Sequence, residues 1–599
     1  MSIPFRRTHL QKTRWLWPVF IVLLITGILL PISPLFRPVP SDDPSVYLYV
    51  GQTMLDGGAP YRDAWDHKPP LAFFLYALGL VLTPAALWGI WVLEAAMLSA
   101  AGVLAYLLLE KIAGPALSAL SVMLGLLGLF PILWGYSIEE FSLVFQVLVL
   151  YALARYLLSA RNTTRAALAF GIGAATGALF FLKQSLIAAG LAAGLYLFLD
   201  LLLCRDRRKL AHLAAVIGGF ALVSALVAGY LWSRGAMASY LSAAFTFNFS
   251  YAGLGLLEQA AAVLEALEYM GSVPVLWLSI GLWLTCGAVA LLQAGPTLAR
   301  WVCKPAARWL LLAGGAGLVA LSLLAEVASS QPGFGLAQQA AAFAGLLMVG
   351  TGLLLAPARR QRIATALTNT PVLPDTETPS GKLREALFFV AAMLFPLILL
   401  LITRSGRNYV YYFFAFTPFI LLAFGLVSSL LLDLLQSSAA RRVIYALLAG
   451  LGLALIYNPA LLLVSGYRAQ INPPLPPIID YIQNQTGPED TILAWGKDTT
   501  YVYFLSQRKA PGRYFYQAAI WQPGYNEQVG AARETLQAMQ ANPPALFLIY
   551  AGPPSADAPA CPLPTAEDDN SEGAIFRFVC ERYTYLQPMD EFLIFALNE

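Results

Sequence analysis

The sequence contains many apolar segments that are long enough to span a membrane as helices. A transmembrane helix needs about 20 apolar residues, and 58% of this chain is hydrophobic. We place spans near residues 15–36, 84–109, 115–134, 141–160, 166–182, 185–203, 211–232, 273–293, 309–328, 335–356, 386–403, 409–430 and 442–464. These segments predict a polytopic α-helical membrane protein with about 13 transmembrane helices.

The basic residues give the predicted spans an orientation. If the N-terminus is cytoplasmic, the inside segments hold about three times as many Lys and Arg residues as the outside loops before the C-terminal region, as the positive-inside rule requires. An odd number of spans then places the C-terminus outside the cytoplasm. The basic stretch at 6–14 precedes the first span with no small-residue cleavage site, so we expect an uncleaved first helix in the cell membrane.

Polar residues gather in the first predicted external loop, residues 37–83. Only 12% of the chain is charged, yet this loop holds Asp42, Asp43, Asp56, Asp63, Asp66, Arg62, Lys68 and His67. Ionisable groups held at a membrane are costly and are therefore functional candidates. Lys68, held above the headgroups, is well placed to meet a phosphate. We interpret the loop as an active site for a reaction in which a lipid phosphate is the leaving group.

The loop also has a predictable local structure. Residues 43–55 are expected to form a short helix on the bilayer surface, capped by Asp43 and with Pro44 in its first turn. The glycines at 57–58 would end this helix, and the prolines at 69–70 would stiffen the approach to the next segment. That segment, up to residue 84, is either an interfacial helix or part of a span.

The same loop carries a recognisable motif. It reads Asp43-x-x-x-Tyr47, Met54-Leu55, Gly58-x-Pro60-Tyr61-x-Asp63 and His67-Lys68-Pro69-Pro70-Leu71. This pattern resembles the first external loop of the GT-C glycosyltransferases, most closely the protein mannosyltransferases and lipid A aminoarabinose transferases of glycosyltransferase families 39 and 83. The resemblance implies that Asp43 is the catalytic base and that Lys68 binds the phosphate of a polyprenyl-phosphate-linked sugar. Pro44 replaces the family's usual glutamate, and His67 stands where relatives often carry one.

The resemblance therefore implies an inverting glycosyltransferase on the outer face of the membrane. Asp43 would take the proton of an acceptor hydroxyl, and Lys68, with Arg407 and Lys183, would stabilise the departing phosphate. The acceptor, whether lipid, glycan or protein, stays open. No nucleotide-binding fingerprint follows a strand, and no coherent basic face indicates nucleic-acid binding. The site needs no nucleotide, because the donor sugar is already linked to the lipid phosphate. A divalent metal at Asp43 and His67 is one candidate, and a hydrogen-bonded surface histidine is the alternative.

Outside this loop, further candidates lie at outer helix ends. Lys183, Arg404 and Arg407 could either reach toward lipid headgroups or clamp the donor phosphate, with Arg407 favoured. Glu139 and Glu140 either support the site or begin a helix in solvent. The other supporting candidates are Asp42, Tyr47, Tyr61 and Asp66.

Three internal segments have more than one interpretation. Glu94 lies within a predicted span, so we expect its carboxylate to be paired, protonated or nearer the membrane surface than the predicted span boundaries imply. The aromatic stretch within 233–272 is either an interfacial belt or a groove for an acceptor or polyprenyl chain. Residues 357–385 are predicted to be a flexible connector.

The composition shifts near residue 466 and divides the chain into a transmembrane catalytic domain, 1–465, and an extracytoplasmic α/β domain, 466–599. Strands are expected at 490–496, 545–550 and 591–596, and helices at 478–484 and 526–540. Cys561 and Cys580 could form a disulfide if this domain faces an oxidising compartment.

Two rival functions remain at this stage. A multispanning lipid or glycan transporter or flippase would explain the spans, but it predicts broken midplane helices and paired half-sequences that the chain does not display. A non-catalytic scaffold would keep the spans and have no need of Asp43 or Lys68.

Overall fold

The computed structural model describes residues 15–204, 206–251, 256–293, 379–434, 471–551 and 571–598, with scattered positions between 442 and 464. Within these residues seven helices are long and apolar enough to cross a membrane, or eight if α13 and α14, bent by 114° at their junction, form one span. The prediction of a polytopic α-helical membrane protein is confirmed. The predicted spans at 309–328 and 335–356, most of 442–464 and the connector up to 378 lie outside the described residues.

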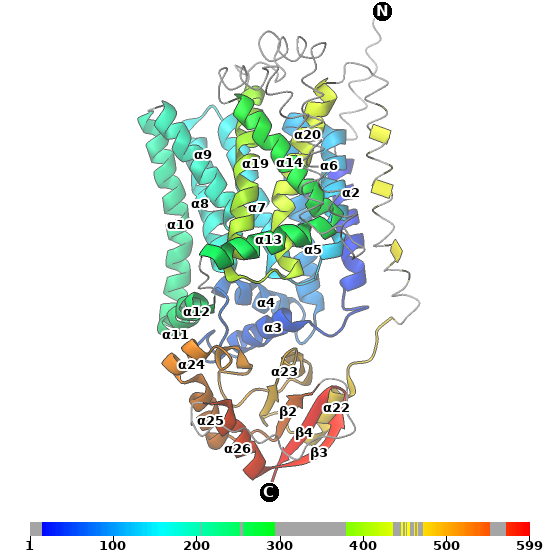
Figure 1. Ribbon diagram of the computed structural model, residues 1–599, viewed down its shortest axis with the longest axis vertical. Coiled ribbons are helices and arrows are strands. Elements are labelled where there is room, and N and C mark those ends of the chain that lie inside the picture. The colour runs from blue at the N-terminus through cyan, green and yellow to red at the C-terminus, as the bar shows by residue number, and fades with distance from the viewer. Residues whose placement is uncertain are drawn as a thin grey trace, which may run out of the picture.

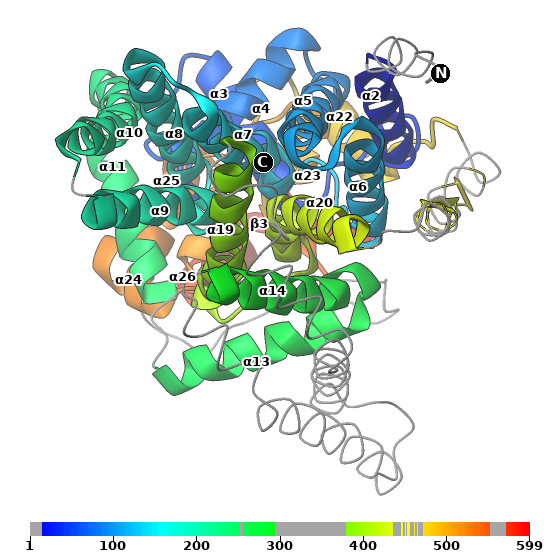
Figure 2. The same cartoon turned by 90° about the horizontal axis from the view of Figure 1, so that it is seen from above.

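The helices of the bundle run roughly parallel to one another (Figure 1). They are α2 (Leu16–Leu29), α5 (Trp88–Ala113), α6 (Pro115–Gly128), α7 (Ile138–Leu158), α8 (Asn162–Leu182), α9 (Ala188–Cys204), α10 (Arg207–Ser233), α14 (Pro274–Gln293), α19 (Pro379–Ile402) and α20 (Thr417–Leu434). Each matches a predicted span to within several residues. Seen from above, α5, α7, α19 and α20 lie among the others, whereas α13 (Leu256–Ser272) runs across the outside of the bundle (Figure 2).

Two short helices separate the bundle from the C-terminal domain (Figure 1). They are α3 (Asp42–Leu55) and α4 (Pro70–Leu82). Their backbones approach so closely that a Cβ at Gly51 would lie 2.9 Å from the backbone nitrogen of Ala77, so this position requires glycine. Gly57 has a φ of +90°, so the predicted glycine stop after α3 is confirmed.

Two expectations for α3 were wrong. The N-cap residue is Ser41, so Asp43 lies inside the first turn instead of capping the helix. Residues 44–51 are buried, so the helix lies beneath protein and is not open on the bilayer surface. The burial has a cause outside the local sequence, since residues of the C-terminal unit such as Thr500 and Phe515 contact Ser45 and Tyr49 of α3.

The C-terminal part contains a four-stranded sheet in the order β1-β2-β4-β3. Strands β1 (Ile492–Trp495) and β2 (Leu546–Tyr550) are parallel, with Ile492 opposite Leu546, and β4 (Phe592–Leu597) is antiparallel to β2. These are the three predicted strands. The edge strand β3 (Tyr583–Met589) was not predicted, because it contains Pro588 and has a register shift after Tyr585.

Helices complete this α/β unit. They are α22 (Pro477–Gln485), α23 (Tyr501–Ser506), α24 (Pro523–Val529), α25 (Ala531–Ala541) and α26 (Glu572–Arg582). The single helix predicted at 526–540 is in fact two, because Gly530 has a φ of +68° and breaks it. Cys580 is disulfide-bonded, and its predicted partner Cys561 lies outside the described residues.

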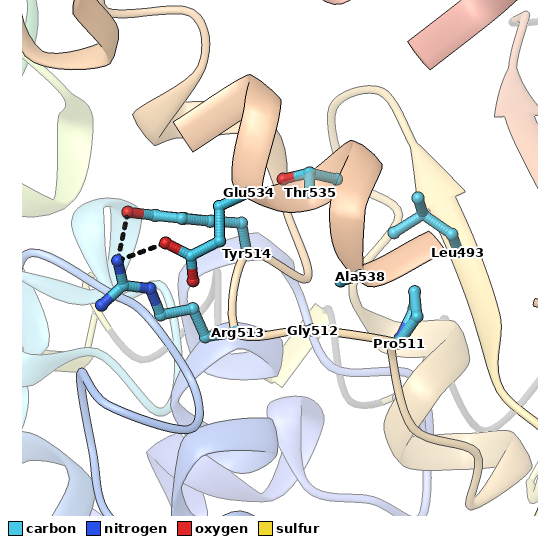
Figure 3. A pocket seen from close by; sticks show the side chains of 8 residues that line it. All are labelled: Leu493, Pro511, Gly512, Arg513, Tyr514, Glu534, Thr535 and Ala538. Carbon is cyan, nitrogen blue, oxygen red and sulfur yellow. Dashed lines mark hydrogen bonds and ion pairs between the residues drawn. The ribbon is translucent and has the colours of Figure 1, made fainter. Parts of the chain in front are cut away.

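A buried tryptophan of the first loop packs against the C-terminal unit. Trp65 is 1% exposed, its ring packs against Tyr514, Tyr516 and Tyr525, and its backbone N–H donates to the carbonyl of Arg513 at 2.9 Å. Figure 3 shows the side chain of Arg513 donating to Glu534 at 2.6 Å and to the hydroxyl of Tyr514 at 2.9 Å. The interface segment around Arg513 is therefore fixed to α25.

Candidate active site

The acid and the lysine of the loop motif lie together at the end of the bundle that faces the C-terminal unit. The Nζ atom of Lys68 is 3.9 Å from Oδ2 of Asp43, and their side chains are 11% and 40% exposed. The hydroxyl of Tyr411 donates to the same Oδ2 at 3.2 Å. Helix α3 supplies the acid, the loop before α4 supplies the lysine, and the tyrosine comes from the 3-10 helix η6 (Val410–Phe416). Asp43 is thus accessible while its cation is largely enclosed.

Lys68 is held from behind by its two neighbours in sequence. Its ammonium lies 3.0 Å from Nε2 of His67, and Nδ1 of His67 lies 3.2 Å from Oδ1 of Asp66. An ammonium can only donate, so Nε2 accepts and the imidazole proton is on Nδ1, facing Asp66. Burial and the charge of Lys68 lower the pKa of His67, which keeps the imidazole neutral near pH 7.

Asp66 anchors this row of side chains. It is 1% exposed, and it accepts from the hydroxyl of Tyr516 at 2.5 Å and from the backbone N–H of Lys68 at 3.4 Å. Burial alone would raise the pKa of Asp66, but His67, Lys68 and the Tyr516 hydroxyl outweigh it and lower the pKa to about 2. Asp66 is therefore an anion at all working pH values.

A second cation faces the same space from another loop. Lys183, directly after α8, donates to Oε1 of Glu139 at 2.5 Å, and its ammonium lies 3.6 Å from the centre of the Tyr412 ring. The side chains of Lys183 and Glu139 are 12% and 3% exposed. Lys183 therefore does not reach toward headgroups, and Glu139 does not begin a helix in solvent. Each side chain is neutralised by the other inside the protein, so for both residues the alternative interpretation, a role in the site, stays a prediction.

Glu140 and Glu94 stabilise the loop before α7. Glu140 accepts from the backbone N–H groups of Trp134, Gly135 and Ser137, and Glu94 accepts from that of Tyr136 at 2.8 Å. Both glutamates are fully buried. Of the three alternatives for Glu94, pairing is therefore confirmed and a position nearer the surface is excluded, and Glu140 does not contact solvent.

The two arginines of the late loop differ in position. The guanidinium of Arg407 lies 4.5 Å from the centre of the Tyr251 ring and donates to the hydroxyl of Tyr409 at 3.2 Å. The ring of Tyr251 lies 5.8 Å from that of His67, so Tyr251 joins Arg407 to the cluster. Arg404 is exposed and reaches Gln259 at 3.4 Å. Among the contacts of the described residues, none joins Arg404 to Asp43 or Lys68.

The remaining supporting candidates have structural contacts of their own. Tyr47 is buried and packs on Phe73 and Tyr76. Tyr61 donates to the carbonyl of Lys68 at 2.7 Å and so shapes the loop. Asp42 is exposed and interacts with the carboxylate of Asp498 in the C-terminal unit, away from Lys68.

The aromatic stretch around α11 (Met237–Leu241) and α12 (Asn248–Tyr251) belongs to the wall of the site. Phe247 packs on His67 with ring centroids 4.8 Å apart, and Asn248 donates to the carbonyl of His67 at 3.1 Å. Phe249, by contrast, is 76% exposed. The stretch is thus only partly the surface belt that was one of its two interpretations.

The residues at the proposed metal position have other partners. The Nε2 lone pair of His67, which a metal would need, accepts from Lys68, and Nδ1 faces Asp66. Within the described ranges no group of three or more His, Cys, Asp or Glu side chains could hold a metal ion. A metal bound by Asp43 and His67 does not fit this arrangement, so no chemical step is assigned to one.

Three contributors to the cluster were absent from the sequence-based candidates: Tyr411, Tyr412 and Tyr516. The first two lie in the aromatic stretch after Arg407, and Tyr516 lies in Arg513-Tyr-Phe-Tyr516 of the C-terminal unit. Aromatic density is their only local signal, and it does not reveal what their hydroxyl groups contact.

The chain is similar to several known proteins. A family model described as "Putative competence-induced protein Ccs4 N-terminal domain" matches residues 7–297. Crystal structures of ArnT from Cupriavidus metallidurans, bound to undecaprenyl phosphate and in the apo state, are 13% and 12% identical, cover 98% of both chains and have TM-scores of 0.43 and 0.42. An Archaeoglobus fulgidus oligosaccharyltransferase, in complex with zinc and sulfate, is 13% identical with a TM-score of 0.36, covering 89% of this chain and 68% of its own. No curated protein sequence matches the chain. These likenesses are distant, so the function is argued from the site.

Proposed function

We propose that this integral membrane protein is a glycosyltransferase that moves a sugar from a polyprenyl-phosphate donor to an acceptor hydroxyl, with inversion, on the outer face of the membrane. The observation that carries the proposal is the pair formed by Asp43 and Lys68. A half-exposed carboxylate lies 3.9 Å from an enclosed ammonium at the end of the spans. The loop motif they belong to resembles that of the GT-C glycosyltransferases.

The charges of this pair suit the reaction. Asp43 takes the proton from the acceptor hydroxyl while the acceptor oxygen bonds to the anomeric carbon, and the bond from that carbon to the phosphate oxygen breaks with its electron pair. Asp43 thereby loses its negative charge as the leaving phosphate gains one. Lys68, held between Asp43 and Asp66, can shift its interaction from the carboxylate to the phosphate during the same step.

Other cations would bind the phosphate in different ways. The ammonium of Lys183 already pairs with the carboxylate of Glu139, so its positive charge is compensated before the donor phosphate binds. Arg407 contacts only tyrosine rings and hydroxyls among the interactions of the described residues. Its guanidinium offers a bidentate fork to a phosphate without first leaving a carboxylate. We therefore assign Arg407 to the donor phosphate and leave Arg404 out of the site.

The test is transfer from a radiolabelled polyprenyl-phosphate hexose in membranes that contain matched amounts of wild type, Asp43→Asn or Lys68→Ala. Matched controls are Asp56→Asn and Lys509→Ala, which remove an acid and a cation from a surface pair on the same face of the protein. We expect both site variants to lose at least about 100-fold in rate, the usual effect of removing a general base or a transition-state charge partner, and both controls to keep wild-type rates.

Transfer at equal rates in all five proteins would remove Asp43 and Lys68 from the mechanism. Absence of transfer in wild type, combined with movement of the intact labelled lipid across the membrane, would replace the transferase by the transporter.

A further inference from the structure

The hydroxyl group of Tyr516, in the C-terminal unit, reaches the candidate active site. Tyr516 lies 450 residues from Asp66 in sequence and donates to Oδ1 of its carboxylate at 2.5 Å. From Asp66 the contacts continue to His67 at 3.2 Å and from His67 to the ammonium of Lys68 at 3.0 Å. These four side chains form a continuous row from the C-terminal unit to the proposed phosphate-binding lysine.

Each member of the row has its orientation fixed by the next. Tyr516 can only donate to a carboxylate, and a hydrogen bond to an ionised group is stronger than a neutral one. With Oδ1 held in this way, Asp66 lies 3.2 Å from Nδ1 of His67 and accepts from the backbone N–H of Lys68. The imidazole then presents its Nε2 lone pair to the lysine ammonium.

The backbone on either side of Tyr516 is itself fixed. Phe515 stacks on Tyr49 of α3 with ring centroids 4.1 Å apart, and the carbonyl of Arg513 accepts from Trp65. The position of the Tyr516 hydroxyl is therefore set by the docking of the whole C-terminal unit on the first loop.

Without this hydroxyl Asp66 would turn to its remaining donors. Asp66 is 1% exposed, so no bulk water is available to replace a lost donor. Its charge would then act more strongly on His67 and Lys68 and draw the ammonium away from Asp43 and the donor phosphate.

We propose that Tyr516 is a positioning residue for the donor phosphate, so that the C-terminal unit completes the binding site for the lipid phosphate. This inference rests on the proposed function, because it needs Lys68 to bind a phosphate. It assigns to the C-terminal unit a part in donor binding that acts through Asp66.

The experiment measures binding of a polyprenyl phosphate, which carries no sugar and cannot react, to the purified full-length protein in detergent. The variant is Tyr516→Phe, which keeps the ring. The matched control is Tyr514→Phe, because this tyrosine packs against the same Trp65 ring but its hydroxyl contacts Arg513. A polyprenol without phosphate is the second ligand.

Loss of a hydrogen bond to a buried charge corresponds to about tenfold or more in affinity. We therefore expect Tyr516→Phe to bind the polyprenyl phosphate about tenfold more weakly and the polyprenol as well as wild type does. Tyr514→Phe should bind both ligands normally. In an Asp66→Ala background, adding Tyr516→Phe should cause no further loss, since the two residues would act through one contact.

The inference would be overturned if Tyr516→Phe bound the polyprenyl phosphate as wild type does. Equal loss of affinity for the polyprenol and the polyprenyl phosphate would also overturn it, because this would show a general loss of structure. Additive losses of affinity in the Asp66→Ala background would overturn it as well, because the two residues would then act independently. The transfer assay with labelled donor separates the two proposals. Wild type that transfers sugar while Tyr516→Phe binds normally keeps the function and rejects the positioning role.

Discussion

Replacing Trp65 by alanine should release the C-terminal unit from the bundle. Trp65 is 1% exposed and packs against three tyrosines of that unit, and its indole N–H donates to Tyr525 at 3.2 Å. Truncation of a buried Trp costs about 3–5 kcal/mol, and the orphaned hydrogen bond adds about 1 kcal/mol. Most of this loss falls on the docked state, so the undocked fraction should rise roughly 100- to 1,000-fold.

Limited proteolysis of the full-length protein in detergent measures this fraction. When undocking is fast compared with cleavage, the rate of release of the C-terminal fragment follows the undocked population. Trp521→Ala is the matched control, because Trp521 is 41% exposed and belongs to the same unit. Equal cleavage rates for Trp65→Ala and Trp521→Ala would refute the idea that Trp65 holds the interface together.

Three further predictions concern single charges. Lys183→Met should destabilise the protein by about 3–5 kcal/mol, because it leaves the buried carboxylate of Glu139 unpaired, and the double variant with Glu139→Gln should recover most of this loss in a denaturation series. The pKa of Asp66 is lowered from 3.8 to about 2 in the folded protein. The ionised carboxylate should therefore add about 2 kcal/mol to the free energy of unfolding above about pH 5, and this stabilisation should be lost as the pH falls from 4 to 2. Asp66→Asn should lack that step in stability measured against pH. Lys509→Ala breaks an exposed pair with Asp56 at 2.8 Å and should change stability by less than about 1 kcal/mol in the same denaturation assay.

The sequence predicted the parts of the molecule that depend on local chemistry. Ten of the predicted spans correspond to described helices, and seven of these helices, or eight with the bent pair, are long and apolar enough to cross a membrane. The first loop could be identified because its charges stand out in an apolar chain, and the structure brings Asp43, Lys68, Asp66 and His67 together. The helix end at Gly57, the helix start at Pro70 and the strands β1, β2 and β4 were also predicted, because each depends on residues adjacent in sequence.

The errors concern partners that are distant in sequence. Glu139 and Lys183 each had a plausible solvent-facing interpretation, and only their pairing across 44 residues shows that both are buried. The helix α3 was placed at an open surface because nothing near Asp43 indicates that a domain covers it. The role of Tyr516 has the same origin, since its single signal is a tyrosine in an aromatic stretch.

The row of side chains that ends at Tyr516 also determines when the site can form. Asp66 is synthesised 450 residues before its partner, and at about 5–20 residues per second the interval is roughly 20–90 seconds. During that time the first loop lacks the surface that fixes it. If Tyr516 positions the donor phosphate as proposed, the donor site is complete only when the last part of the chain has been made and has folded, and a product truncated before Tyr516 should bind polyprenyl phosphate more weakly than the full-length protein.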